Sequence, residues 1–256
     1  MQIAGYLKTS LIEWPGKISS VIFTPGCNFR CPFCHNADLV DSSKAAKLQS
    51  FKEDEVLKDL EKRKKWVDAV VITGGEPTLQ PSLSKLLKKL KSLKLLIMIH
   101  TNGTRPEVIR KLIINGLADY IAMDVKGNFD EYQNFTNVKT QMSNVKSSIE
   151  LIIESGIEYE FRTTVVPGLH DLKNLKRLAE QLKSTVYSLQ STDSSSSAVI
   201  RQKAVDGLKW FLQQFRPLNT LDKKYLEIKP FSKEEMEMFK KELQEIIPLT
   251  SLRGVS

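Results

Sequence analysis

The sequence has few cysteines and lacks any long apolar run. Its 256 residues include only three cysteines, and this odd number gives poor support to a disulfide framework. No apolar stretch reaches the roughly 18 residues that a membrane-spanning helix needs. The N-terminus has no basic segment followed by a long apolar stretch, so we expect no secretory signal and no membrane partner. These absences favour a cytoplasmic protein.

Positive charge is abundant, but it is mostly lysine. The net charge is +8, and much of it lies in helix-like stretches at 58–66 and 85–94. Lysines on amphipathic helices usually form a solvated face, and a nucleic-acid surface would be better supported by arginine and aromatic residues among them. A nucleic-acid partner is therefore not favoured, whereas an acidic protein partner stays an alternative.

Short β-rich runs alternate with longer amphipathic stretches along the chain. We predict strands at 19–24, 67–75, 95–103, 118–127, 159–168 and 208–215, and helices at 51–66, 81–93, 106–116, 144–156, 171–184 and 232–247. Such alternation predicts an α/β fold with a parallel sheet. Six units in one domain suit a partial (β/α)6 barrel with a C-terminal helical extension better than a flat, doubly wound sheet.

One stretch interrupts this alternation. Residues 184–207 include the run SSSS and have low complexity, so they are interpreted as a surface insertion without an assigned role. The remaining chain is expected to form a single domain over 1–256, with its core at about 17–216.

Unusual residues follow the predicted strands, where chemistry gathers in parallel α/β folds. In chain order they are the cysteine-rich loop, GGEP (74–77), TNG (101–103), Asp124 with Lys126, PGLHD (167–171), and Gln213 with Gln214. We therefore expect the active site at the C-terminal ends of the strands.

All three cysteines, Cys27, Cys31 and Cys34, lie in the window CNFRCPFCHN. With His35 they could bind zinc, but structural zinc usually joins two separated ligand pairs, and here one loop supplies every ligand. An iron–sulfur cluster explains the pattern better. Cubane clusters normally have four Cys ligands, so three ligands leave one iron open to a small molecule.

The spacing C-x₃-C-x-aromatic-C, with Phe33 as the aromatic residue, resembles the signature of radical S-adenosylmethionine (SAM) enzymes. The resemblance implies a partial barrel and a [4Fe–4S] cluster on three cysteines. It also implies that SAM binds the open iron through its amino and carboxylate groups. Reductive cleavage of SAM would then give a 5′-deoxyadenosyl radical, and the protein would orient the cofactor.

Further matches extend this resemblance to a set of residues expected to contact SAM. The GGEP segment would contact the SAM amino group, Phe33 would lie beside the adenine, and MDVK (123–126) and an arginine on the fifth strand would complete the site. The expected SAM contacts are Phe33, Gly74, Gly75, Glu76, Pro77, Asp124, Lys126 and Arg162. Asp124 and Lys126 lie on one side of a strand, although an exposed pair at a strand end is the alternative.

His100 precedes TNG at a position where related activators carry an acid, so its role stays open, and simple packing is an alternative. The resemblance implies radical chemistry, which requires no side chain to act as an acid or base. We therefore assign no catalytic residue beyond the cluster and SAM.

Within the family, GCNFRCPFCHN and MDVK resemble the activating enzymes of glycyl-radical proteins. The stretch 5–36, FLQQFRP (211–217) and LRG (252–254) are similar to the activating proteins of anaerobic ribonucleoside-triphosphate reductase. This likeness implies that reductase as the partner and a flavodoxin or ferredoxin-type electron donor. Accessory clusters are not expected, because the chain has no further cysteine.

Three alternatives remain open. The protein could activate another glycyl-radical enzyme, such as pyruvate formate-lyase, or act on a small molecule, as the deazaguanine-forming members of the family do. It could instead be a basic, zinc-binding module that contacts nucleic acid. An inert barrel without any metal is the third.

Overall fold

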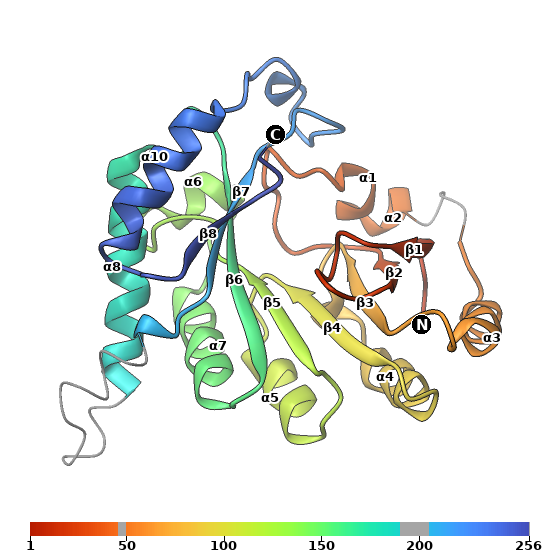
Figure 1. The fold of residues 1–256 in the computed structure, drawn as a ribbon. Coiled ribbons are helices and arrows are strands. Elements are labelled where there is room, and N and C mark those ends of the chain that lie inside the picture. Colours follow the sequence, from red (N-terminus) through yellow and green to blue (C-terminus); the bar gives the residue numbers. More distant parts are fainter. Residues whose placement is uncertain (46–49, 190–204, 256) are drawn as a thin grey trace, which may run out of the picture.

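The computed structural model describes residues 1–45, 50–189 and 205–255, and it shows one curved sheet with helices along its outer face (Figure 1). The strands pair in chain order, with β1 antiparallel to β2 and all later neighbours parallel. They are β1 (Gly5–Ser10), β2 (Ser19–Thr24), β3 (Ala69–Gly74), β4 (Leu96–Thr101), β5 (Tyr120–Asp124), β6 (Glu158–Val165), β7 (Trp210–Gln214) and β8 (Thr250–Arg253). The predicted α/β fold with a parallel sheet is confirmed.

Amphipathic helices follow most of the strands and cover the outer face of the sheet. On α4, four leucines spaced at three and four residues are buried, whereas Lys85, Lys88 and Lys89 face solvent. The helices are α1 (Ala37–Val40), α2 (Ser42–Ala45), α3 (Glu53–Arg63), α4 (Leu83–Ser92), α5 (Pro106–Ile114), α6 (Tyr132–Thr136), α7 (Met142–Glu154), α8 (Leu172–Leu189) and α10 (Lys233–Gln244), with 3₁₀ turns η1 (Pro77–Leu79) and η3 (Lys223–Leu226).

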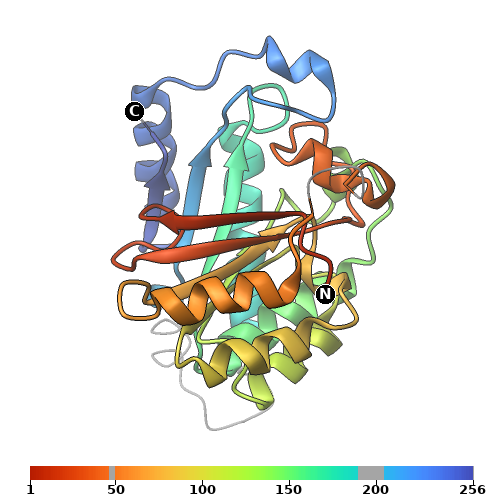
Figure 2. The same cartoon turned by 90° about the vertical axis from the view of Figure 1, so that its right-hand side faces the viewer.

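The two faces of the sheet have different cores. The larger core lies between the sheet and the helices. The inner face holds a smaller cluster in which Trp14, from the loop between β1 and β2, packs over Val71, Met98 and Ala122. Figure 2 shows the β1–β2 hairpin crossing in front of the other strands. The lower part of the barrel interior is therefore filled by side chains, and the open space lies at the strand ends.

The sheet has two strands that the sequence did not predict. β1 is largely exposed, and β8 has only four residues, so neither shows a clear apolar pattern. The predicted C-terminal helix is confirmed as α10, but the chain then returns to the sheet as β8. Among the described residues β1 and β8 do not pair with each other, so the barrel is partial.

Helix α8 extends further than predicted. Its last residues up to Leu189 fall inside the expected insertion at 184–207, and Thr185 and Val186 are buried on it. The serine run lies outside the described residues. No described helix has the length and apolarity needed to cross a membrane.

Candidate active site

A cavity of about 340 Å³ opens at the C-terminal ends of the parallel strands, a volume typical of small-molecule sites. Its wall includes ten of the eleven residues expected to bind the cluster or SAM, all except the buried Pro77: Cys27, Cys31, Phe33, Cys34, Gly74, Gly75, Glu76, Asp124, Lys126 and Arg162. Residues far apart in sequence thus meet at one place, as the strand-end pattern predicted.

The two glycines of GGEP bring β3 close to the start of the cysteine loop. A Cβ atom on Gly75 would collide with the backbone of Gly26, and one on Gly74 would collide with the backbone of Thr24. Gly74 also has a φ of 114°, which disfavours any other residue. The N–H of Glu76 donates to the Gly26 carbonyl at 2.8 Å. Close packing of two backbones therefore explains the glycines, while their predicted contact with SAM stays a prediction.

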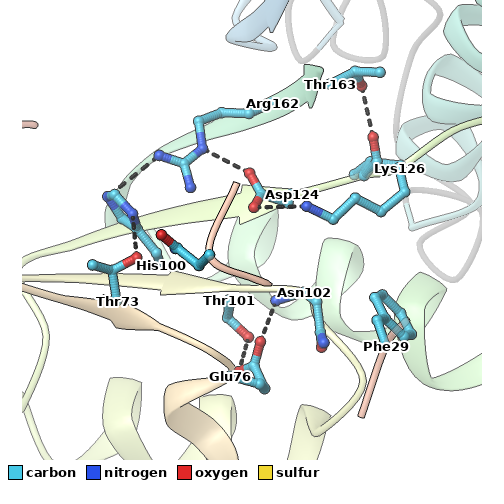
Figure 3. Close-up of polar contacts among 12 residues, drawn as sticks. Phe29, Thr73, Glu76, His100, Thr101, Asn102, Asp124, Lys126, Arg162 and Thr163 are labelled. Carbon is cyan, nitrogen blue, oxygen red and sulfur yellow. Dashed lines mark hydrogen bonds and ion pairs between the residues drawn. The ribbon is translucent and has the colours of Figure 1, made fainter. Parts of the chain in front are cut away.

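The carboxylate of Glu76 joins GGEP to the TNG loop. It is 1% exposed and accepts from the Thr101 hydroxyl at 2.8 Å and the Asn102 N–H at 2.7 Å (Figure 3). The N–H and hydroxyl of Thr78 donate to the same carboxylate. Burial raises the pKa of Glu76, although these hydrogen bonds oppose the shift. Its oxygens are thus occupied by the protein, and its predicted contact with SAM stays a prediction.

The three thiols are free, and they line the cavity together. Burial raises the pKa of Cys27 to about 11 and that of Cys31 to about 12. Such thiols are poor nucleophiles at neutral pH, but a bound metal deprotonates its thiol ligands outright. In the described part of the chain, no three His, Cys, Asp or Glu side chains converge as they would on a single ion. The three free thiols in one cavity are therefore available as metal ligands.

Asp124 forms the centre of an ionic group on the opposite wall. Its carboxylate accepts from Arg162 Nε at 2.8 Å and from Lys126 Nζ at 3.0 Å (Figure 3). Burial alone would raise the pKa of Asp124, but the two cations hold it well below its usual range. Two cations around one carboxylate leave a net positive charge, which suits an anionic ligand group such as a carboxylate.

His100 also lines the cavity, beside Arg162. Its Nε2 lies 3.3 Å from Arg162 Nη1 and its Nδ1 lies 3.2 Å from the Thr73 hydroxyl. Since a guanidinium can only donate, Nε2 accepts and Nδ1 carries the proton. Burial and the adjacent guanidinium lower the pKa of His100 well below its usual value. The histidine is therefore a neutral, packed acceptor that orients Arg162.

Sequence reasoning missed the residues that hold the end of β5. His170 Nδ1 accepts from the Val166 N–H at 3.1 Å, and its Nε2 therefore donates to the Lys126 carbonyl at 2.9 Å. The Thr163 hydroxyl donates to the Val125 carbonyl at 2.7 Å. The signal in the sequence that could have identified His170 was a histidine in the motif PGLHD, directly after a strand. These contacts fix the backbone from which Lys126 projects.

A second missed group lies deeper in the barrel. Both terminal nitrogens of Arg253, on β8, donate to the carboxylate of Glu160, and the Tyr120 hydroxyl donates to it at 3.2 Å. Glu160 also lies 3.9 Å from Arg162 Nη1. Glu160 and Arg162 are two residues apart on β6, so the alternation of the strand could have placed them on one face. The charges thus alternate in sign from Lys126 at the cavity to Arg253 inside the barrel.

The chain after β7 covers the cysteine loop. The N–H of Arg216 donates to His35 Nε2 at 3.4 Å, and the His35 ring stacks on Phe215. The N–H of Asp222 donates to the Pro32 carbonyl at 2.9 Å. His35 is thus held by protein groups, with its Nε2 already accepting a hydrogen bond.

Comparisons with known proteins identify the family of this chain. The sequence model of the Radical SAM superfamily matches residues 21–182. The chain is 33% identical over 88% of its length to a protein of Methanocaldococcus jannaschii, provisionally named a glycyl-radical enzyme activating enzyme, and covers 93% of it. It is 27% identical to the pyruvate formate-lyase-activating enzyme of Clostridium pasteurianum, over 93% of this chain and 94% of that one.

A solved structure has the same fold. Coproporphyrinogen III oxidase of Escherichia coli, described as a radical SAM enzyme, superposes with a TM-score of 0.57 at 16% identity, over 92% of this chain and 53% of that chain. The likeness therefore covers the barrel and not only the cysteine loop.

Proposed function

This chain belongs to the radical SAM superfamily, and from that premise we propose that it activates a glycyl-radical enzyme, namely anaerobic ribonucleoside-triphosphate reductase. Enzymes of this family use a [4Fe–4S] cluster and SAM. One observation supports the proposal most directly: three free thiols and the ionic group around Asp124 line the same cavity. The M. jannaschii relative, whose provisional name is that of such an activator, supports the activating role.

The residues on the wall suit both cofactors. Cys27, Cys31 and Cys34 would hold the cluster, and the cations of Lys126 and Arg162 would attract the carboxylate of SAM. When bound, the cluster and SAM would supply the radical chemistry that removes a hydrogen atom from a glycine of the partner.

The chain itself supplies orientation and exclusion of water. Phe33 is 3% exposed and lines the cavity, where it can pack against the adenine. His100 stays neutral and holds Arg162 in place, so no acid or base is required of it. A dry, fixed site protects a reactive intermediate from side reactions.

Two of the three stretches that resemble the reductase activators contribute to the cavity. Glu13, from the β1–β2 loop, and Gln213, from β7, line its wall. Arg253, from the third stretch, lies with its guanidinium 4.3 Å from the ring centre of Phe211 on β7. Glu13 and Gln213 thus line the cavity that a partner's glycine must approach, and the resemblance of their stretches to the reductase activators supports the reductase as target. The C. pasteurianum relative favours pyruvate formate-lyase as the second candidate.

Electron paramagnetic resonance tests the proposal. Protein reconstituted without oxygen is reduced with dithionite and incubated with SAM and either anaerobic ribonucleotide reductase or pyruvate formate-lyase. We expect a glycyl-radical signal with the reductase and little with the lyase. The Cys31→Ala variant, which should lack the cluster, is the matched control.

Each outcome has a distinct meaning. A signal with the lyase alone would move the target to the second candidate. SAM cleavage without a signal from either protein would favour a small-molecule substrate. Zinc in place of iron after anaerobic purification would contradict the radical chemistry altogether.

A further inference from the structure

The segment after β7, residues 216–229, has no role in the proposed function, yet it covers the cysteine loop. Asp222 hydrogen-bonds to the Pro32 carbonyl at 2.9 Å, and the ring centres of Tyr225 and Phe33 are 6.4 Å apart. Figures 1 and 2 both show the segment, in blue, next to the orange-red chain that carries the cysteines. Pro32 and Phe33 lie between Cys31 and Cys34, so the segment 216–229 packs against the part of the loop that joins these two cysteines.

The outer side of the segment 216–229 combines exposed leucines with cations. Leu218 is 65% exposed and Leu226 is 44% exposed. The segment contains four cations and two carboxylates, Asp222 and Glu227, for a net charge of +2. The four cations are exposed and form no ion pair within the described part of the chain: Arg216, Lys223, Lys224 and Lys229. Exposed apolar side chains with charged residues around them, here with positive charge in excess, are typical of a protein interface.

We infer that the segment 216–229 is the docking surface for an acidic protein that delivers single electrons to the cluster. This inference rests on the proposed function, because only a redox cluster in the cavity needs an external electron. The cations favour an acidic partner, since complementary charge steers association. Electron transfer slows steeply with distance, and this surface lies directly over the loop that carries the thiols. In the step, the carrier loses one electron and the cluster gains it, with no bond made or broken.

The lysine-rich helix α4 is not placed to serve as a docking surface for electron transfer to the cluster. Its buried leucines pack against the sheet, and the helix lies along the outer face of the barrel, away from the cysteine loop (Figure 1). Lys85 and Lys88 are exposed and form no ion pair among the described residues. Their position makes them a matched control, because charge reversal there changes the net charge equally without touching the proposed surface.

Charge reversal in the full chain tests the inference. In the variant Lys223→Glu/Lys224→Glu, we expect a reduced acidic flavodoxin to reduce the reconstituted cluster about tenfold more slowly at low salt, as charges at an interface act mainly on association. The affinity for flavodoxin, measured by calorimetry on protein with and without the cluster, should fall by a similar factor. Both differences should shrink as salt is added, because the charges become screened.

Two further measurements separate the surface from the chemistry. Dithionite should support equal SAM cleavage in the wild type and in Lys223→Glu/Lys224→Glu, since a small reductant needs no docking surface. The control Lys85→Glu/Lys88→Glu should keep the wild-type rate with flavodoxin. An unchanged flavodoxin rate and affinity in Lys223→Glu/Lys224→Glu, or equal losses in both double variants, would overturn the inference.

Two other outcomes test the inference and the proposed function separately. Normal reduction by flavodoxin combined with slow glycyl-radical formation would assign the segment 216–229 to the partner reductase and overturn the inference. If the wild type cleaves no SAM even with dithionite, the proposed function fails, and the affinity for flavodoxin still decides whether the surface binds an acidic carrier.

Discussion

The two walls of the cavity are built from different interactions. The wall from β2, β3 and β4 is joined by hydrogen bonds to backbone and hydroxyl groups, with the carboxylate of Glu76 at their centre. The wall from β5 to β7 is joined by ion pairs among Lys126, Asp124 and Arg162, and these continue deeper in the barrel to Glu160 on β6 and Arg253 on β8. Hydrogen bonds to backbone fix a shape, whereas charged side-chain ends can respond to a ligand. Changes on the first wall should therefore affect stability most, and changes on the second should affect binding most.

The cysteines are the exception on the first wall, because their loss should abolish function while the fold survives. Replacing Cys31 with alanine should eliminate the cluster and all SAM cleavage. The side chain removed is small, so the free energy of unfolding should change by only about 1 kcal/mol. Iron content, SAM cleavage and urea unfolding measure the three effects. SAM cleavage that persists in this variant would contradict the assignment of Cys31 as a ligand.

Glu76 tests the first wall itself. In Glu76→Ala, the N–H groups of Thr78 and Asn102 and the hydroxyl of Thr101 lose a buried acceptor. We expect the free energy of unfolding to fall by about 3 kcal/mol, because each unsatisfied buried donor costs about 1–3 kcal/mol and some can find water. Urea unfolding at neutral pH measures the loss.

The conservative variant Glu76→Gln serves as the control. It keeps one acceptor oxygen and should lose clearly less stability than the alanine variant. Equal losses in the two variants would mean that side-chain volume, and not the hydrogen bonds, stabilises this wall.

The first wall could be predicted from sequence because its residues lie in short, contiguous motifs. CNFRCPFC and GGEP each follow a strongly apolar strand, so the parallel fold alone brings them to one edge. The packing of Gly75 against Gly26 could not be predicted, since no pattern in either motif records a contact across two strands.

The second wall was predicted only in part. Asp124, Lys126 and Arg162 were identified by resemblance, but their mutual ion pairs and the position of His100 depend on the register of three strands. Glu160 was missed, because its partner Arg253 lies on β8, a strand of four residues with a weak apolar pattern. Ion pairs between distant strands leave no periodic signal in a single sequence.

His170, which holds the backbone of the second wall, should make the stability of the protein sensitive to acid. Burial lowers the pKa of His170 to about 4, from 6.5 in the unfolded chain. Between these values the unfolded state binds more protons, so stability is lost as the pH falls below 6.5. We expect the pKa shift of His170 alone to lower the free energy of unfolding by about 2 kcal/mol between pH 7 and pH 5, at 1.36 kcal/mol per pKa unit.

The variant His170→Gln isolates that contribution. Glutamine can still donate to the Lys126 carbonyl, but it does not titrate. Urea unfolding at pH 7 and pH 5 should show a loss about 2 kcal/mol smaller in the variant than in the wild type. Identical losses in both proteins would show that other groups set the acid sensitivity.

Arg253 tests whether the ion pairs of the second wall act on the ligand from a distance. Without Arg253, the carboxylate of Glu160 keeps Arg162 as its nearest cation, 3.9 Å away. Arg162 should then turn toward Glu160 and release Asp124. We expect the affinity of Arg253→Gln for SAM, measured by calorimetry on reconstituted protein, to fall about tenfold, which corresponds to about 1.4 kcal/mol.

The double variant Arg253→Gln/Glu160→Gln distinguishes this coupling from simple loss of structure. Removing the charge of Glu160 removes its pull on Arg162, so the affinity for SAM should return toward the wild-type value even though β8 still lacks its ion pair. A purely structural role of Arg253 predicts the opposite, since a second substitution would then add to the damage or leave it unchanged. Recovery in the double variant would therefore mean that a charge on the last strand positions Arg162, and through it Asp124, without either Arg253 or Glu160 lining the cavity.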